Sequence, residues 1–167
     1  MEIINLQKTH NRGSFDSEAP LLDEYIKKQA SQDVRRDLSA CYVLANEENI
    51  VLAYYTLSGN SIPKDDLPEG LLKKLRLPGS YRELPAVLLG RLAVDKNEKG
   101  KRRGELMLMN ALERCLNLSE QLGTLAVIVD PIDEKAIAFY EKYGFLKLKS
   151  SNKMFIPMGT IRQLFQQ

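Results

Sequence analysis

The sequence contains one histidine, two cysteines and no tryptophan among its 167 residues. The single histidine, His10, excludes a multi-histidine metal site, and a serine–histidine or cysteine–histidine relay would depend on that one imidazole. Because its neighbours are polar, we expect His10 to be a solvated surface residue. Cys41 and Cys115 lie far apart and form no Cys-x-x-Cys pair, so we expect packing residues rather than a disulfide framework or a thiolate metal site.

Long apolar runs and a strong charge bias are also missing. No segment approaches the roughly 18 apolar residues of a membrane span, and the first five residues carry no basic and apolar leader, so we expect no membrane association and a cytoplasmic protein. Lysine plus arginine exceeds aspartate plus glutamate by only 24 to 22, which alone does not favour a polyanionic partner. Neither a Walker A loop nor a Gly-x-Gly-x-x-Gly fingerprint occurs, which disfavours P-loop NTPases and Rossmann dinucleotide enzymes.

The length and the 44% hydrophobic content are typical of one folded domain over residues 1–167. The apolar period predicts a strand over 2–6 and a helix from Ala19-Pro20 to about residue 30. An antiparallel hairpin follows over 41–45 and 50–57. The density of glycine and proline in 58–85 permits one short helix near 69–75 and no long element. We expect the leucines of that segment to pack onto the core rather than to line an acceptor groove or a dimer contact; they are Leu67, Leu71, Leu72 and Leu75.

The second half of the chain alternates strands and helices. Residues 86–94 form a buried strand with a plausible bulge at Gly90-Arg91. A long helix is predicted over 103–122 with Gly123 as its stop, followed by a strand over 124–129 and a helix over 133–143. A strand pair, 145–149 and 153–157, precedes a short tail helix. Because the two periods alternate without a repeat, the sequence predicts one α/β or α+β layer structure.

The segment 92–104 runs from a strand through a basic turn into a helix. Such a junction directs unpaired backbone N–H groups and the positive end of a helix dipole toward one point, which suits a phosphate. From charge alone, a solvated basic turn is an equally good interpretation. Five cations lie within eight residues: Lys96, Lys99, Lys101, Arg102 and Arg103.

The predicted helix over 133–143 carries Ala136, Tyr140 and Tyr143 on one face. Aromatic residues in such a pattern are usually packed in a core. A phenol with a pKa near 10 can also donate a proton to a leaving thiolate, whose thiol has a pKa near 8.5. Periodicity does not choose between the two interpretations.

With these motifs, nearly the whole chain resembles the GNAT family of N-acetyltransferases. The resemblance implies a largely antiparallel, twisted sheet flanked by helices, in which a strand like Leu89–Val94 splays from its neighbour and pairs with the pantetheine arm of acetyl-CoA. The family's pyrophosphate loop reads Gln/Arg-x-x-Gly-x-Gly/Ala. Here Arg102 replaces the first glycine of that motif, and side-chain donors of Arg102 would compensate for it. The resemblance implies that no metal is needed. It also implies that acetyl-CoA is bound by Leu92, Ala93, Val94, Lys99, Gly100, Lys101, Arg102, Arg103 and Gly104.

The chain is closer still to a clade of acetyltransferase toxins that block the amine of aminoacyl-tRNA and are paired with ribbon-helix-helix antitoxins. The strings that carry this resemblance are Phe15, Leu22-Asp23-Glu24-Tyr25-Ile26, Gln32-Asp33, Arg35-Arg36, residues 54–58, 88–95 and 138–145. The resemblance implies that Tyr140 is the general acid. Candidate contacts to tRNA phosphates, each of which can also be a solubilising charge, are Arg35, Arg36, Lys73, Lys74, Arg76 and Arg82. We expect no base-stacking aromatics between them.

The expected reaction is direct attack of a neutral amine on the thioester, with no covalent acyl-enzyme. Backbone N–H groups around Ala93 and Val94 would polarise the thioester carbonyl. Two alternatives remain open at this point. The protein could acetylate a small amine or a protein N-terminus, or it could be a catalytically silent module that binds CoA, an interpretation that the missing glycine favours. A homodimer is also compatible with the sequence.

Overall fold

The computed structural model describes residues 1–166, which form two compact units. The first unit contains Met1–Ser58 and Leu89–Ala111, and the second contains Gly59–Leu88 and the chain from Leu112 onward. A single acetyltransferase domain over residues 1–167 stays a prediction.

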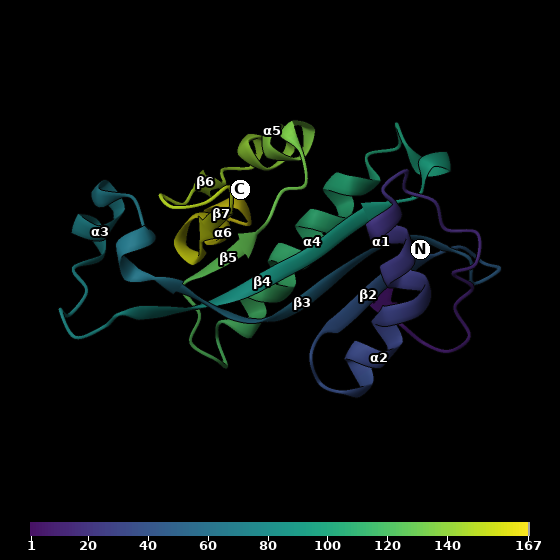
Figure 1. The fold of residues 1–167 in the computed structure, drawn as a ribbon, viewed down its shortest axis with the longest axis horizontal. Coiled ribbons are helices and arrows are strands. Elements are labelled where there is room, and N and C mark those ends of the chain that lie inside the picture. The colour runs from purple at the N-terminus through teal and green to yellow at the C-terminus, as the bar shows by residue number, and fades with distance from the viewer. Residues whose placement is uncertain (167) are drawn as a thin grey trace. The chain divides into compact units, whose positions relative to one another are not determined.

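The described strands form one seven-stranded sheet in the order β1-β2-β3-β4-β5-β7-β6 (Figure 1). Strands β1, β2 and β3 pair antiparallel, and β7 pairs antiparallel with both β5 and β6. The predicted α/β or α+β fold with a largely antiparallel sheet is therefore confirmed. A splay between the central strands and a bulge at Gly90-Arg91 stay predictions. The strands are β1 (Ile3–Asn5), β2 (Ala40–Ala45), β3 (Val51–Pro63), β4 (Glu83–Val94), β5 (Ala126–Val129), β6 (Leu146–Lys147) and β7 (Met154–Pro157).

The helices lie close to where the apolar period predicts them, although several end elsewhere. They are α1 (Pro20–Glu24), α2 (Ala30–Arg35), α3 (Glu69–Leu75), α4 (Arg103–Leu118), α5 (Glu134–Lys142) and α6 (Met158–Leu164). Helix α4 ends at Leu118 rather than at residue 122, because residues 119–122 continue only as hydrogen-bonded turns. Helix α5 begins after Asp133, whose carboxylate accepts a hydrogen bond from the Ala136 N–H at 2.8 Å.

The first unit packs its helical segment against the sheet through aromatic residues. Between α1 and α2 the chain forms a π-helical turn, Tyr25–Gln29, so the predicted helix continues to Arg35 with one irregular turn. Phe15 and Tyr25 both pack on Tyr54, with ring centroids 5.5 and 6.3 Å from it. The Arg91 guanidinium lies 3.4 Å from the centroid of the Tyr25 ring.

The second unit contains all of the glycine- and proline-rich segment 58–85 except Ser58. Helix α3 lies where the sequence predicts it, but the expectation of no long element is wrong, because β3 continues to Pro63 and β4 begins at Glu83. The breakers interrupt only the chain between these strand ends, where pairing in the sheet outweighs local propensity. Leu67 is fully buried, and the predicted packing of the other leucines is confirmed; those that pack on this core are Leu71, Leu72 and Leu75.

Two expectations about titratable side chains have different outcomes. His10 is only 6% exposed, so the expectation of a solvated residue is wrong: its Nδ1 accepts a hydrogen bond from the Gln7 N–H at 2.9 Å, which its polar neighbours in sequence do not reveal. Cys41 and Cys115 are buried free thiols, as predicted, and burial raises the pKa of each to about 12. None of the helices in residues 1–166 has the length and apolar character that crossing a membrane requires.

Candidate active site

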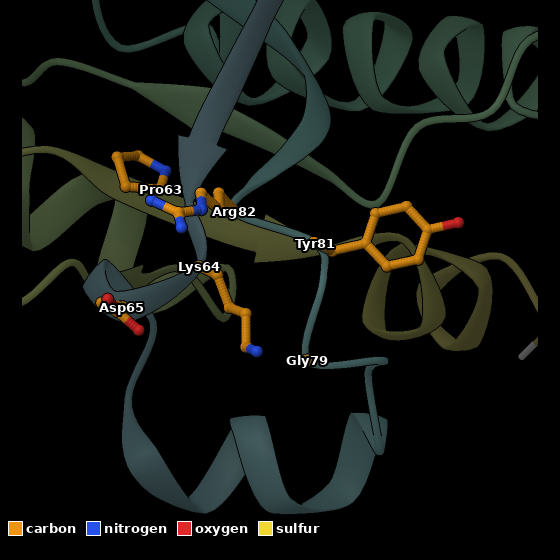
Figure 2. Close-up of a pocket in the computed structure, with 6 residues that line it drawn as sticks. All are labelled: Pro63, Lys64, Asp65, Gly79, Tyr81 and Arg82. Atoms are coloured by element: carbon orange, nitrogen blue, oxygen red, sulfur yellow. The ribbon is translucent and has the colours of Figure 1, made fainter.

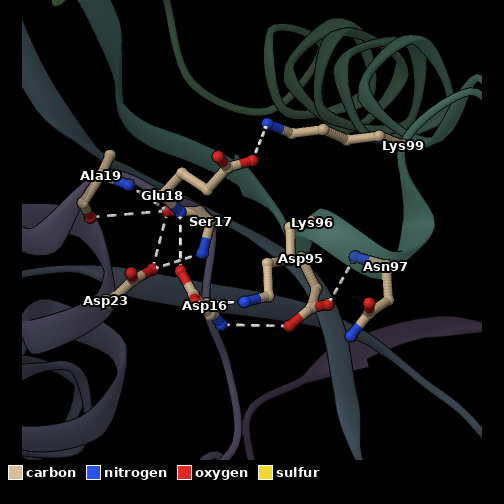
Figure 3. A network of polar contacts seen from close by, with 9 residues as sticks. All are labelled: Asp16, Ser17, Glu18, Ala19, Asp23, Asp95, Lys96, Asn97 and Lys99. Atoms are coloured by element: carbon tan, nitrogen blue, oxygen red, sulfur yellow. Dashed lines mark hydrogen bonds and ion pairs between the residues drawn. The ribbon is translucent and has the colours of Figure 1, made fainter.

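The turn between β4 and α4 begins at a buried carboxylate, Asp95, which is 6% exposed. Its Oδ1 accepts a hydrogen bond from the Asn97 N–H at 2.9 Å, and its Oδ2 accepts one from the Asp16 N–H at 3.0 Å (Figure 3). The Asp95 N–H donates to the Leu52 carbonyl of β3 at 2.8 Å. These bonds fix the backbone of the 3₁₀ turn Lys96–Glu98 relative to the sheet.

An N-terminal segment, residues 16–18, is bound along this turn. The Lys96 N–H donates to the Asp16 carbonyl at 2.8 Å, and the Lys96 ammonium lies 3.0 Å from the Asp16 carboxylate. Beside this pair, the Lys99 ammonium lies 2.6 Å from Glu18 Oε1 (Figure 3). Hydrogen bonds from the two lysines lower the pKa of Asp16 and of Glu18.

Each of the five cations of the turn forms an ion pair with a carboxylate. The pairs are Lys96–Asp16, Lys99–Glu18, Lys101–Glu98, Arg102–Glu105 and Arg103–Glu98. The pairs of Lys96 and Lys99 are about half exposed on both sides, where an ion pair contributes only about 0–1 kcal/mol. A phosphate can therefore exchange with Asp16 or Glu18 at little cost, whereas Lys101 and Arg103 share the buried Glu98.

The backbone of the turn adopts left-handed conformations at two positions. Gly100 has φ of +82°, and a Cβ built on it would meet no atom within 4 Å, so the backbone there is open to close approach. Arg102 has φ of +58°, which is unusual for a residue with a side chain. The residue that replaces the family's glycine thus keeps the backbone conformation that glycine favours.

Helix α4 starts directly after Arg102 and includes Arg103 and Gly104 in its first turn. The first N–H groups of a helix have no partner within it, and the helix dipole adds positive potential at the same end. Together with the ammonium and guanidinium groups around it, this end has the donor chemistry that a pyrophosphate requires. Leu92, Ala93 and Val94 end β4 immediately before the turn, with Ala93 buried and the other two half-buried.

Tyr140 lies in α5 of the second unit and is 8% exposed. Its ring packs between Phe139 and Phe145, with centroid distances of 5.2 and 5.1 Å. The hydroxyl forms no hydrogen bond to the described residues, and none of their fully buried side-chain oxygens lacks a partner, so the hydroxyl keeps access to the surface. Burial raises the pKa of this phenol well above its usual range, so it stays protonated at neutral pH.

The candidate tRNA contacts are all exposed and lie in both units. In the first unit, Arg35 is the last residue of α2 and Arg36 follows it. The others are in the second unit: Lys73 and Lys74 lie in the last turn of α3, Arg76 follows it with φ of +47°, and Arg82 precedes β4.

Sequence reasoning missed the carboxylates that hold the basic turn. Glu98 and Glu105 lie three residues from Lys101 and Arg102, a spacing that local charge patterning can detect. Asp16 and Glu18 are about 80 residues from their lysine partners, and no local pattern signals such pairs.

Comparison with known proteins places these features in a family. The family model described as "Acetyltransferase (GNAT) family" matches residues 3–145. The chain is 32% identical to a tRNA-acetylating toxin of Mycobacterium tuberculosis (strain ATCC 25618 / H37Rv) over 132 residues, 79% of this chain and 76% of the relative. It is 29% identical over 93% of its length to the probable toxin TacT of Sinorhizobium fredii (strain NBRC 101917 / NGR234), of which 89% is covered.

Solved structures give the same result. A tyrosine-to-phenylalanine mutant of KacT has a TM-score of 0.90 and 29% identity, with 98% of each chain covered. AtaT complexed with acetyl-methionyl-tRNAfMet has the same TM-score and coverage at 28% identity. A tyrosine-to-phenylalanine mutant of AtaT, bound to acetyl-CoA and to the C-terminus of the antitoxin AtaR, has a TM-score of 0.81 and 26% identity, with 99% of this chain and 98% of that chain covered. With a family model that matches residues 3–145 and a relative that is 32% identical over 79% of its length, this chain belongs to the GNAT family of acetyltransferases.

Proposed function

We propose that this protein transfers the acetyl group of acetyl-CoA to the α-amine of aminoacyl-tRNA and so acts as a toxin that blocks translation. The observation that carries the proposal is the similarity, over 98% of both chains and with a TM-score of 0.90, to AtaT complexed with acetyl-methionyl-tRNAfMet. The 32% identity to a tRNA-acetylating toxin supports the same substrate.

Acetyl-CoA supplies an activated acetyl thioester. The turn residues Lys99–Gly104 would bind its pyrophosphate through backbone N–H groups and cationic side chains, while Leu92, Ala93 and Val94 at the end of β4 would lie along its pantetheine arm. The open backbone at Gly100 and the left-handed Arg102 support this assignment, because both allow the main chain to approach a phosphate closely. Backbone N–H groups near Ala93 and Val94 would polarise the thioester carbonyl.

Tyr140 would donate a hydrogen bond to the departing CoA thiolate. Because burial raises its pKa, the phenol is always protonated at neutral pH, but it is also a weak acid relative to a thiol. Full proton transfer to sulfur is therefore completed by the ammonium that forms when the neutral amine attacks. Tyr140 acts chiefly by stabilising the developing negative charge, in a site where a preorganised donor is effective.

Direct attack by the amine requires no acyl-enzyme. Both thiols of the chain, Cys41 and Cys115, are buried and have pKa values raised to about 12, so neither is suited to carry an acetyl group. An aminoacyl ester has an α-amine with a pKa near 7.7–8.0 or below, which leaves an appreciable neutral fraction near pH 7. A strong general base is then dispensable.

The proposal includes a protein partner and a location. A ribbon-helix-helix antitoxin is expected to bind this protein, since the similar toxin AtaT is found in a complex with its antitoxin AtaR. The location that fits a tRNA substrate is the cytoplasm. A homodimer belongs to the same proposal, and its test is the molar mass in solution.

The direct test incubates the purified protein with radiolabelled acetyl-CoA and total cellular tRNA, either charged or deacylated. Label on charged tRNA alone is the expected result. Label on neither form, together with transfer to free amines or peptide N-termini, would establish the alternative acetyltransferase. Transfer to charged tRNA should weaken steeply as salt rises, whereas transfer to a small amine should be less sensitive.

The catalytically silent alternative depends on the absent motif glycine. Arg102 keeps the left-handed backbone at that position, which weakens the argument that the turn has lost its phosphate site. Calorimetric binding of CoA without any acetyl transfer to charged tRNA or free amines would nevertheless favour the silent module.

A further inference from the structure

The second unit contains a pocket of about 300 Å³. Its lining residues belong neither to the turn 95–104 nor to the helix that carries Tyr140. It lies where β3 ends and β4 begins, next to the loop that follows α3 (Figure 2). The volume is at the lower end of the range for small-ligand sites, large enough for one phosphorylated group. Its lining residues are Pro63, Lys64, Asp65, Gly79, Tyr81 and Arg82.

The base of this pocket is held by hydrogen bonds and a small core. The Lys64 N–H donates to the Arg82 carbonyl at 2.8 Å, which joins the backbones of the two residues, while Figure 2 shows their charged groups pointing in different directions. Two residues after Lys64, the buried Asp66 carboxylate accepts a hydrogen bond from the Ser150 N–H at 2.7 Å. Ile62 near the end of β3 and Leu84 near the start of β4 are buried in the same core cluster. The two cations therefore extend from a fixed scaffold.

Neither cation of the pocket is neutralised. In the described residues 1–166, neither Lys64 nor Arg82 forms an ion pair with a carboxylate, whereas every cation of the turn 95–104 does. Figure 2 shows the Lys64 amine projecting toward the Gly79 loop, with Asp65 on its other side. A Cβ built on Gly79 meets nothing within 4 Å, so the backbone there is open. The pocket thus offers an ammonium and a guanidinium to a ligand.

Tyr81 identifies the ligand more closely. Its ring is 54% exposed, and Figure 2 shows it projecting away from the Arg82 guanidinium. The expectation that no base-stacking aromatic lies between the candidate cations did not consider this residue. Exposed aromatic rings next to cations bind nucleotides by stacking a base while the cations contact a phosphate. The Asp65 carboxylate can only accept hydrogen bonds, and a ribose 2′-hydroxyl is a suitable donor.

From these observations we propose that the pocket binds the phosphate backbone of the RNA substrate through Lys64 and Arg82, with a ribonucleotide of the same strand against Tyr81. The inference deepens the proposed function, on which it rests, by assigning a substrate contact outside the region that binds acetyl-CoA. It adds Lys64 and Tyr81 to the contacts that the sequence predicts.

The test measures binding of fluorescein-labelled deacylated tRNA by anisotropy over a range of salt concentrations, so that it needs no catalysis. The variant Lys64→Gln/Arg82→Gln should bind roughly tenfold more weakly at low salt, because two charge-assisted phosphate contacts are lost. The slope of log K against log salt should fall by about 0.7–0.9 for each cation removed. Tyr81→Ala should weaken binding with the slope unchanged, and Tyr81→Phe should bind as the wild type does.

The matched control is Lys153→Gln/Arg162→Gln, which removes the same charge from exposed positions of the same unit outside the pocket. It should change the affinity much less than the pocket variant. Equal losses in both double variants would overturn the proposal, since they would indicate net charge alone. Inorganic phosphate, added at constant ionic strength, separates the two sources of a phosphate group: it should compete with tRNA only at high concentration, and tight binding of free phosphate would contradict an RNA site.

Failure of this proposal is distinguishable from failure of the proposed function. A protein that acetylates charged tRNA, yet whose pocket variants bind tRNA normally, would refute only the pocket. Wild-type protein that binds tRNA through the pocket without acetylating it would refute only the proposed reaction. Melting temperatures equal to that of the wild type confirm that the variants are folded.

Discussion

Tyr140 combines a packed ring with a hydroxyl that no described residue engages. The ring contacts Phe139 and Phe145, so it belongs to the aromatic packing that periodicity predicts. Its hydroxyl contributes no hydrogen bond to that packing, which leaves it free for a ligand. Both interpretations of this residue from the sequence are therefore compatible, because they concern different atoms of the same side chain.

Replacing Tyr140 with phenylalanine should separate the two roles. We expect kcat to fall by about 10²–10³, the usual cost of removing one preorganised hydrogen-bond donor to a developing negative charge, with the melting temperature and the calorimetric Kd for CoA unchanged. Because burial raises the pKa of the phenol, the wild-type rate should show no alkaline decline from phenol ionisation near pH 10. Single-turnover transfer rates across pH measure both effects. A phenylalanine variant with full activity would exclude the proposed role.

Arg102 has a side chain at a left-handed position, which costs an L-residue about 1–2 kcal/mol. Arg102→Gly should relieve this cost, partly offset by the greater flexibility of glycine in the unfolded chain. The matched variant Arg102→Ala loses the same ion pair with Glu105 but keeps a Cβ. We expect the glycine variant to be more stable than the alanine variant by about 1 kcal/mol, as measured by denaturant unfolding. An alanine variant as stable as the glycine variant would contradict backbone strain at this position.

At the scale of elements, the turn 95–104 and the segment 16–18 form one structure. The Asp95 carboxylate bonds both of them, and the pairs Lys96–Asp16 and Lys99–Glu18 hold their side chains together. A ligand phosphate that contacts Lys99 either displaces the Glu18 carboxylate or shares the ammonium with it against like-charge repulsion. The segment 16–18 is thus predicted to compete with CoA for the turn.

Glu18→Gln should weaken this competition. We expect the Kd for CoA to fall by roughly two- to fivefold, because an exposed ion pair contributes no more than about 1 kcal/mol. Isothermal titration calorimetry at low salt measures the change, which should vanish at high salt. The control is Glu24→Gln, which removes an exposed carboxylate at the end of α1 that pairs with Lys28 of the following π-helical turn. If both variants bind CoA equally tightly, the effect is one of net charge and the specific competition is refuted.

The elements differ in how far the sequence could predict them. Helix α3 and the start of α5 are predicted closely. Glu69–Leu75 lies between prolines and glycines that interrupt other elements, and Asp133 is the N-cap of α5. The end of β3 and the start of β4 are missed, because Gly59 and Pro85 lie inside strands that pairing in the sheet extends. The π-helical turn Tyr25–Gln29 is also missed, since the apolar spacing of that segment fits an ordinary helix.

Across the whole molecule, local sequence patterns predict the main residues of the candidate site. Contacts between residues far apart in the sequence, which hold those residues in place, could not be predicted. The run of cations, the strand-to-helix junction and Tyr140 are all readable within short windows of sequence. The pairing of Asp16 and Glu18 with that run, and the meeting of Lys64 with Arg82, depend on how distant segments pack. The burial of His10 also depends on distant packing, and the polar residues beside it in the sequence give no sign of it.

His10 is predicted to make the stability of the whole molecule depend on pH near neutrality. Burial, and secondarily the charge of Arg12, lowers its pKa below 6.5, and its Nδ1 already accepts the Gln7 N–H. The unfolded chain therefore binds a proton more readily than the folded chain, so the stabilising contribution is complete above pH 6.5 and decreases as pH falls through the lower folded value. We expect the melting temperature to fall between about pH 7 and pH 5.5. In His10→Asn, whose amide oxygen can accept the same N–H without titrating, the melting temperature should change less over that interval, since the carboxylates with lowered pKa titrate at lower pH. Parallel curves for the two proteins would assign the pH dependence to other groups.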